Sequence, residues 1–240
     1  MSTQSKIEWT ETTWNPVTGC TKISEGCRNC YAERMAKRLQ AMGAENYRNG
    51  FMVTMHEHML ECPLHWKSPR KIFVNSMGDL FHEDVPDDFI RRVFKVMNEA
   101  YWHQFQVLTK RSARLLELNS QLRWSKNIWV GVTVEKEEYK FRIDDLRKTS
   151  AKIKFLSCEP LLGPLNNLNL HGIDWIIVGG ESGPGARSIA ENWILSIRDT
   201  CERNDIPFFF KQWGGVNKKR NGRVLQGQLW NQIPSFLSSL

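Results

Sequence analysis

Short apolar segments alternate with amphipathic segments along most of the chain. Apolar runs that fit buried strands lie at residues 13–18, 71–75, 105–109, 128–133, 153–157, 175–178 and 207–210. Apolar residues recur at helical spacing in 31–42, 87–100, 112–118, 136–148 and 189–204. The connection after residue 157 is rich in Pro and Leu and shows no clear helical pattern. Strands that alternate with helices are typical of parallel βαβ units, so we expect an α/β fold.

Polar residues follow the apolar part of six successive predicted strands. They are Asn75, Ser76 and Asp79; Thr109, Lys110 and Arg111; Thr133 and Glu135; Ser157 and Glu159; Gly179, Gly180, Glu181 and Ser182; and Lys211, Gln212 and Trp213. Loops are generally polar, but here carboxylates follow successive strands together with lysine and arginine. A β/α barrel assembles its site from the carboxyl ends of its strands. The pattern therefore predicts a partial TIM-like barrel of about six βα units, with one site at this end.

The length of 240 residues fits one α/β barrel, and we expect a single domain over residues 1–240. Residues 44–70 are irregular and contain two prolines, so they are expected to form an insertion. The tail over residues 214–240 contains the dipeptide Asn221-Gly222, which is typical of two-residue hairpin turns. We therefore expect a short C-terminal extension with a hairpin at that dipeptide.

The composition gives a formal net charge of +7 and a pI near 9.1. This basic excess permits a nucleic acid or another anionic substrate without requiring one, because the charged residues are spread along the chain. The first six residues lack the apolar core of a signal peptide, and no apolar run is long enough to span a bilayer. We therefore expect a cytoplasmic protein that does not associate with membranes.

Three of the six cysteines lie close together in the sequence, at Cys20, Cys27 and Cys30. In a reducing cytosol, clustered cysteines indicate metal or redox chemistry rather than disulfides. The third cysteine leads into the predicted helix at 31–42, and the dipole and free amides of a helix N-terminus favour the thiolate that metals bind. Three thiolates would leave one position open on a tetrahedral ion or on one corner of a cluster.

The residues alone leave three assignments open for these cysteines. They could pack as buried thiols, as free cysteine often does. They could bind zinc in a closed site completed by Cys62 or His65. They could hold an iron–sulfur cluster with one iron that no protein side chain binds, which is the assignment that we favour.

The cysteine loop and the strand–helix units behind it resemble those of radical S-adenosylmethionine (SAM) enzymes. The resemblance is closest to a group of phage-associated and bacterial proteins, and it covers nearly the whole chain. The shared segments are Cys-Tyr-Ala-Glu-Arg-Met at 30–35, Asn-Ser-Met-Gly-Asp-Leu-Phe at 75–81, Leu-Thr-Lys-Arg at 108–111, Glu-Pro-Leu-Leu-Gly at 159–163 and Gly-Gly-Glu-Ser-Gly at 179–183. Spore photoproduct lyase resembles the chain more distantly. One difference is that six residues separate the first two cysteines here, whereas three do so in the common radical SAM loop.

The resemblance implies a [4Fe–4S] cluster on Cys20, Cys27 and Cys30, with its fourth iron bound by the amino and carboxylate groups of SAM. In such enzymes an electron from an external donor cleaves the sulfonium, and the resulting 5′-deoxyadenosyl radical abstracts hydrogen from a substrate. The cofactor then performs the difficult step, while the protein binds, orients and excludes water.

The resemblance also implies roles for residues near the amino-terminal strands. Tyr31 would pack near the adenine or the cluster, unless it is a core aromatic of the first helical turn. Ser76, Gly78 and Asp79 would hold the methionine amino group, with a solvated cap for the next helix as the alternative.

Later strands would then contribute the nucleoside contacts. Thr133 and Glu135 would contact the ribose, and Ser157 and Glu159 would lie near the nucleoside. The Gly179, Gly180 and Glu181 segment matches a Gly-Gly-Glu motif of the family but lies on the sixth predicted strand, so we expect it to line the adenine end or the substrate pocket.

Cations and tryptophans at the same end allow two interpretations each. Lys110, Arg111, Arg187 and Lys211 would hold a SAM carboxylate or a substrate phosphate, or would pair with Glu135, Glu159 and Glu181 inside the barrel. We expect Trp9, Trp14 and Trp213 to flank the mouth, where they would stack on a base or simply pack.

We therefore expect a radical SAM enzyme that acts on a nucleobase or nucleotide in nucleic acid and needs an external electron donor. The alternative is a zinc- or cluster-stapled nucleic-acid-binding protein without catalysis. A metal-dependent hydrolase is disfavoured, because its ligands would be His and Asp rather than thiols.

Overall fold

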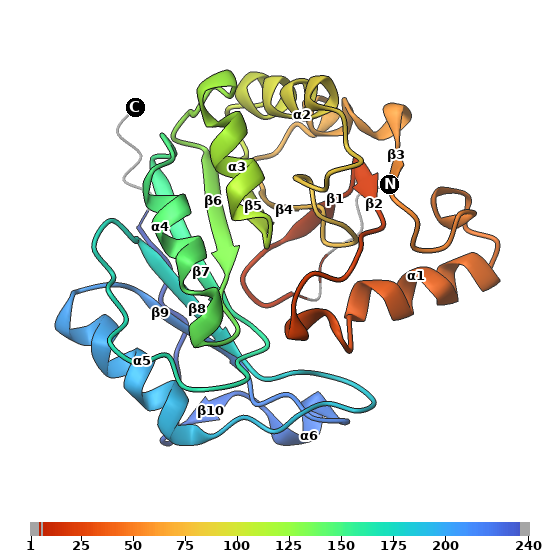
Figure 1. The fold of residues 1–240 in the computed structure, drawn as a ribbon. Helices are drawn as coiled ribbons and strands as arrows, with labels where there is room; N and C mark the ends of the chain where they lie inside the picture. Colours follow the sequence, from red (N-terminus) through yellow and green to blue (C-terminus); the bar gives the residue numbers. More distant parts are fainter. Residues whose placement is uncertain (1–4, 6, 236–240) are drawn as a thin grey trace.

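The computed structural model describes residue 5 and residues 7–235, and it contains one large parallel sheet. Its seven strands have the spatial order β1 (Thr12–Trp14), β4 (Lys71–Val74), β5 (Gln104–Thr109), β6 (Ile128–Thr133), β7 (Ile153–Cys158), β8 (Trp175–Gly179) and β9 (Phe208–Gln212). The sheet curls into a half-barrel with helices packed against it (Figure 1). The prediction of a partial TIM-like barrel is thus confirmed.

The long helices lie where the apolar periodicity placed them. They are α1 (Tyr31–Ala41), α2 (Asp87–Glu99), α3 (Ser112–Leu118), α4 (Phe141–Arg147) and α5 (Glu191–Arg203). The predicted helix at 136–148 is divided into a 3₁₀ turn, η6 (Glu137–Tyr139), and α4. A further 3₁₀ turn, η5 (Asn119–Gln121), follows α3, and no helix lies between β7 and β8 within the described chain, as the Pro- and Leu-rich sequence predicted.

The predicted strand at 13–18 is two strands. β1 joins the large sheet, whereas β2 (Val17–Thr18) pairs antiparallel with β3 (Thr54–Met55). Pro16 has no N–H to continue a ladder, so the chain changes partners there. The segment at 44–70 also contains the 3₁₀ turns η2 (Glu45–Tyr47), η3 (Glu57–Met59) and η4 (Cys62–His65).

The predicted hairpin turn at Asn221-Gly222 is wrong. Those residues end the short helix α6 (Lys218–Asn221), and Gly222 stops it with a φ of 67°. The hairpin follows, between β10 (Val224–Leu225) and β11 (Gln228–Leu229). Its central residues Gln226 and Gly227 have φ of 49° and 78°, the positive values that a two-residue turn of this kind requires.

Successive residues of the strands point to opposite faces of the sheet and belong to two separate apolar clusters. One face packs against the helices and includes Val130 and Leu156 from the sheet and Ile194 from α5. The concave face carries an aromatic cluster, which we call the aromatic floor; its buried members are Trp9, Trp129, Phe155, Trp175, Ile177 and Phe209. Most of these residues lie in the amino-terminal halves of their strands, so the floor closes the end of the half-barrel opposite the carboxyl ends.

Two of the three tryptophans expected at the mouth lie elsewhere. Trp9 is part of the aromatic floor, with its ring centroid 4.8 Å from that of Phe73. Trp14 is fully buried in the other cluster, where its indole N–H donates to the Met59 carbonyl at 2.7 Å. Both therefore serve packing.

Within the described chain, no helix is both long and apolar enough to cross a membrane. The signal-peptide expectation rests on residues 1–6, and of these residues 1–4 and 6 lie outside the described part.

Gly131 is required by the aromatic floor. A Cβ at this position would lie 2.5 Å from the Phe155 ring, which is closer than packed atoms allow. We expect Gly131→Ala to lower the free energy of unfolding by about 1–3 kcal/mol.

Urea denaturation measures this effect. Gly163→Ala is the matched control, because a Cβ there meets only the Lys136 side chain at an ordinary 3.7 Å. Equal urea midpoints of unfolding for Gly131→Ala and Gly163→Ala would contradict the packing argument.

Candidate functional site

The cysteine loop, residues 19–30, follows β2 and lies beside the carboxyl end of β4. Gly19 and Gly78 form a parallel bridge, and the Gly19 N–H donates to the Met77 carbonyl at 2.9 Å. A Cβ on Gly78 would lie 2.9 Å from the Gly19 carbonyl oxygen. The close approach that Gly78 permits is therefore to the cysteine loop, rather than to a ligand.

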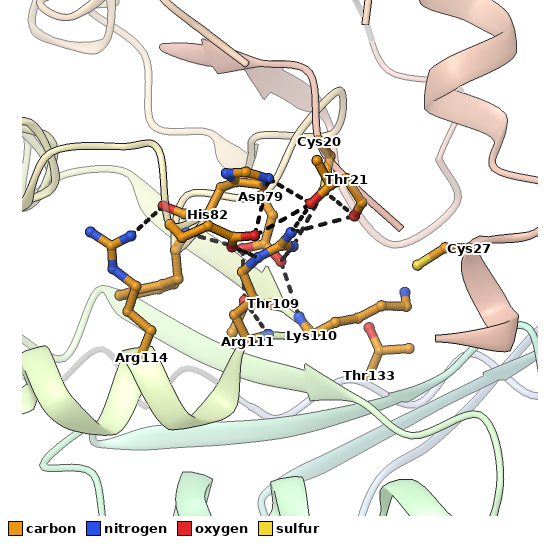
Figure 2. Close-up of polar contacts among 12 residues, drawn as sticks. Cys20, Thr21, Cys27, Asp79, His82, Thr109, Lys110, Arg111, Arg114 and Thr133 are labelled. Atoms are coloured by element: carbon orange, nitrogen blue, oxygen red, sulfur yellow. Dashed lines mark hydrogen bonds and ion pairs between the residues drawn. The ribbon is translucent and has the colours of Figure 1, made fainter. Parts of the chain in front are cut away.

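Arg111 holds the first cysteine. Its Nη1 lies 3.3 Å from Cys20 Sγ and 3.3 Å from Asp79 Oδ2, and its Nη2 donates to Thr21 Oγ1 at 2.9 Å. Figure 2 shows the Arg111 side chain between Asp79 and the loop. Burial and then the Asp79 carboxylate raise the pKa of Cys20 to about 11, although Arg111 acts in the opposite direction.

Asp79 is occupied by protein groups. Thr109 Oγ1 and the Phe81 N–H donate to Oδ1 at 2.7 and 3.0 Å, and the Lys110 N–H donates to Oδ2 at 3.2 Å. With Arg111 added, the carboxylate orients β4, β5 and the cysteine loop against one another. It caps no helix, since α2 begins only at Asp87.

Glu135 holds the middle of the loop. Its carboxylate is fully buried, and Oε1 accepts a hydrogen bond from Ser24 Oγ at 2.6 Å. Oε2 accepts one from Arg142 Nη1 of α4 at 2.8 Å, and Lys110 Nζ lies 3.7 Å from Oε1. Gly26 packs directly on this carboxylate, because a Cβ there would lie 2.4 Å from Glu135 Oε1.

The second cysteine lies beside these groups. Cys27 Sγ is 3.5 Å from Ser24 Oγ, and Figure 2 shows the Cys27 side chain directed toward Lys110. Burial raises the pKa of Cys27, but the charge of Lys110 and hydrogen bonds from Ser24 and the Ile23 backbone outweigh it, so the net shift is downward.

Glu181 holds the end of the loop that precedes Cys30. Its Oε2 accepts hydrogen bonds from Asn29 Nδ2 at 3.0 Å and from Arg187 Nε at 2.9 Å, and Arg187 Nη2 donates to Oε1 at 2.6 Å. The same Nη2 donates to the Glu25 carbonyl at 2.9 Å. Burial alone raises the pKa of Glu181, but the hydrogen bonds from Arg187 and Asn29 lower it to about 2.

Three buried carboxylates from three strand ends thus anchor one loop, each with an arginine partner. The expected pairing of cations with carboxylates occurs for Lys110 with Glu135 and for Arg187 with Glu181. Lys211 likewise pairs with Glu159, at 2.7 Å. Asp79, Glu135 and Glu181 therefore have partners within the protein, and the ligand contacts that the resemblance implied for them stay predictions.

The last strands pack tightly at the same end. Gln212 Nε2 donates to Ser182 Oγ at 2.6 Å and to Glu159 Oε1 at 3.3 Å. A Cβ on Gly180 would lie 2.0 Å from the Trp213 carbonyl oxygen, and one on Gly179 would lie 3.4 Å from Glu159. Gly180 is therefore needed for backbone contact between β8 and the segment after β9.

The remaining predicted residues differ in position. Thr133 and Ser157 are buried. Thr133 follows the floor residue Trp129 by four positions and Ser157 follows Phe155 by two, so their side chains share the concave face. Ser76 Oγ donates a hydrogen bond to Asn15 Oδ1 at 3.2 Å. The Tyr31 side chain is 61% exposed, so it is not a core aromatic.

The donor set suits an iron–sulfur cluster. Cys20, Cys27 and Cys30 are free and partly exposed on one loop, and two of the sulfurs have a polar neighbour within hydrogen-bond range. No three His, Cys, Asp or Glu side chains of the described residues lie close enough together to hold one metal ion. A four-iron cluster takes one thiolate on each of three irons, so its ligands stand further apart than those of a single ion.

The zinc alternative does not fit the geometry. The Pro63 carbonyl in η4 contacts His103 Nε2 at 3.0 Å, and the Trp66 carbonyl accepts from Trp102 Nε1 at 2.9 Å. These partners precede β5, whereas Arg111 and Cys20 lie beyond its other end, roughly 16 Å away along a six-residue strand. Cys62 and His65 therefore lie at the opposite end of the sheet from the cysteine loop.

Several anchoring residues were missed by the sequence analysis. Arg142 lies on α4 and donates to Thr133 O and Glu135 from there, and Arg34 of α1 donates to the Ser182 carbonyl at 2.7 Å. His82 Nε2 contacts Thr21 Oγ1 at 2.8 Å. Arg142 is only 2% exposed, but nothing in the helical spacing distinguishes a buried arginine from a solvated one.

We expect Glu135→Gln to lower the free energy of unfolding by about 3 kcal/mol, because Arg142 would remain buried without its counter-charge. Glu137→Gln removes a neighbouring glutamate from a surface pair with Lys140 and is expected to cost less than about 1 kcal/mol. Denaturant titration of both variants tests this, and losses of equal size would be inconsistent with a buried anchor.

A second prediction concerns the stability of the protein at acidic pH. Because the folded-state pKa of Glu181 lies near 2, below its ordinary 4.5, its contribution to stability is complete above pH 4.5 and is lost as the pH falls toward 2. The unfolding free energy of the wild type should therefore fall more steeply over that range than that of Glu181→Gln. Glu117→Gln, at an exposed position of α3, makes the same charge change and should keep the wild-type slope.

Solved structures with a similar fold include a double mutant of spore photoproduct lyase with bound AdoMet and dinucleoside spore photoproduct, at 10% sequence identity and a TM-score of 0.50. Another is spore photoproduct lyase complexed with dinucleoside spore photoproduct, at 11% identity and a TM-score of 0.47. Each match covers 75% of this chain and 58% of the lyase chain, so the present chain spans little more than half of that protein. At this identity the likeness shows a shared fold alone.

No curated protein matches the chain in sequence. One family does match, over residues 4–234, and its description is "Protein of unknown function (DUF5131)". Since the match extends over nearly all of the sequence, the chain belongs to this family.

Proposed function

We propose that the protein is a radical SAM enzyme that carries a [4Fe–4S] cluster on Cys20, Cys27 and Cys30. The observation that carries the proposal is the loop itself, in which three free thiols are anchored to the carboxyl ends of a half-barrel. The fold is shared with a lyase structure that contains AdoMet, which supports the same assignment.

When bound, the cluster would supply the electron that cleaves SAM into methionine and a 5′-deoxyadenosyl radical. The work left to the chain is positioning. Arg111 would donate a hydrogen bond to the Cys20 sulfur, and Ser24 would donate one to the Cys27 sulfur. The aromatic floor would exclude water from the end of the half-barrel opposite the cysteine loop.

Of the groups expected to contact SAM, we favour those that do not anchor the cysteine loop. Asp79, Glu135 and Glu181 are engaged in anchoring the loop, so Thr133, Ser157 and the Glu159–Lys211 pair are our candidates for contacts on the concave side. Lys110 lies between Glu135 and Cys27, where its charge would favour an anionic ligand.

We further propose a nucleobase or nucleotide in nucleic acid as the substrate, together with an external electron donor. The basic composition supports the first point. The dinucleoside bound in the lyase structure supports it as well.

Anaerobic reconstitution tests the proposal. The wild type should bind iron and sulfide at about four each per chain and, with SAM and dithionite, should release 5′-deoxyadenosine. Cys27→Ala should lose both properties. Cys62→Ala is the matched control, because its thiol lies at the other end of the sheet and should leave both unchanged.

Each alternative has its own result. A wild type that keeps its iron but forms no 5′-deoxyadenosine would be a cluster-stapled binding protein rather than an enzyme. Iron loading that depends equally on Cys62 would contradict the assignment of the ligands.

A further inference from the structure

A groove of about 620 Å³ lies beside the cysteine loop, and its lining shares Arg187 with the contacts that anchor the loop. We call it the basic groove. It is lined by Ala186, Arg187, Ser188 and Ile189 from the segment after β8 and by Trp213, Gly215, Val216 and Asn221 from the segment after β9. Figure 1 shows the first segment running beside α6.

The two walls are joined by backbone contacts. Ser182 and Gly215 form a parallel bridge, the Gly183 N–H donates to the Gly215 carbonyl at 3.0 Å, and the Gly215 N–H donates to the Glu181 carbonyl at 2.7 Å. The groove is therefore a built feature of the fold, not a gap between independent loops.

The two segments that form the walls are basic in sequence, although Arg187, the charged residue among the described lining, is itself paired with Glu181. Residues 182–190 and 213–223 contain five Lys and Arg residues and no Asp or Glu; they are Arg187, Lys218, Lys219, Arg220 and Arg223. The net charge of the whole chain is +7, so two short segments hold most of the excess. The centres of the two segments are about 30 residues apart in the sequence, and only the fold brings them together. Such a surface attracts a polyanion.

The groove also offers an aromatic face. The Trp213 indole N–H donates to the Val224 carbonyl at 2.8 Å, and the ring meets Phe210 edge-on at 5.1 Å between centroids. With its N–H bonded, the half-buried ring can contact a ligand only by packing. Stacking on an aromatic ring requires an unpaired base, which favours a single strand over a duplex.

The groove adjoins the thiols through two hydrogen bonds. Arg187 Nη2 donates to the Glu25 carbonyl at 2.9 Å, and Asn29 Nδ2 donates to the Gly185 carbonyl at 2.8 Å. A ligand in the groove would thus lie against the wall that supports the loop between Cys20 and Cys30.

We propose that the basic groove binds single-stranded nucleic acid, with a base stacked on Trp213 and the backbone phosphates along the side of α6. As the substrate-binding surface it rests on the function proposed above, but binding itself requires neither iron nor SAM.

The test uses the full chain and a fluorescently labelled single-stranded DNA oligonucleotide, followed by anisotropy at 0.15 M salt. Arg220 is exposed, and Arg220→Glu is expected to weaken binding by about 10-fold. Lys126→Glu makes the same charge change at an exposed position before β6, at the other end of the sheet. Screening over a Debye length of about 8 Å should keep its effect below about 2-fold.

A second variant tests the stacking. The oligonucleotide should quench tryptophan fluorescence in the wild type, and Trp213→Phe should remove most of that quenching while the far-UV circular dichroism stays unchanged. A duplex of the same sequence should compete more weakly than the single strand.

Equal losses for Arg220→Glu and Lys126→Glu would overturn the proposal, as would a wild type that binds no oligonucleotide. If the wild type forms 5′-deoxyadenosine but Arg220→Glu binds the oligonucleotide as tightly as the wild type, the groove assignment is wrong and the proposed enzymatic function is unaffected. If binding depends on Arg220 but no iron is retained, the groove stands and the proposed enzymatic function fails.

Discussion

The buried ion pair between Glu135 and Arg142 determines where the cysteine loop can lie. Both side chains are almost fully removed from water, at 0% and 2% exposure. Such a pair is costly unless every oxygen and N–H finds a partner. Arg142 also donates to the Thr133 carbonyl, and the second Glu135 oxygen is satisfied by Ser24 of the loop, whereas Arg142 Nε has no hydrogen-bond partner among the described residues. The loop therefore completes a hydrogen-bonding requirement of the barrel, and its position is set by that requirement.

Asp79 and Glu181 repeat the arrangement on either side. Each is buried, each has an arginine partner, and each touches the loop either directly or through that arginine. The carboxyl ends of the strands thus form a rim that supports the loop, while the aromatic floor closes the opposite end. Between them the concave face carries small or neutral groups, Gly131, Thr133 and Ser157, together with the Glu159–Lys211 pair.

The sequence predicted the fold well because strand and helix periodicities are local. The seven strands and five long helices all lie within a few residues of their expected places. The partners of individual side chains could not be predicted in the same way. Glu135 bonds to Arg142, seven residues further on, and that contact depends on the direction in which helix α4 runs. Trp9 was misplaced for the same reason, because its position before β1 does not reveal the interior of the half-barrel. The prediction of a hairpin turn at Asn221-Gly222 was wrong because the same two residue types also end helices, with glycine at a positive φ.

The spacing of the anchors along the chain has a consequence for biogenesis. The loop at residues 19–30 is synthesised before all of its partners, which are at positions 79, 111, 135, 181 and 187. Domains fold as units once enough of the chain has emerged. The thiols consequently lack part of their supporting contacts until residue 187 has been translated. Any metal delivered earlier would meet a loop without all of its anchors, so maturation of the site belongs after residue 187 has been translated.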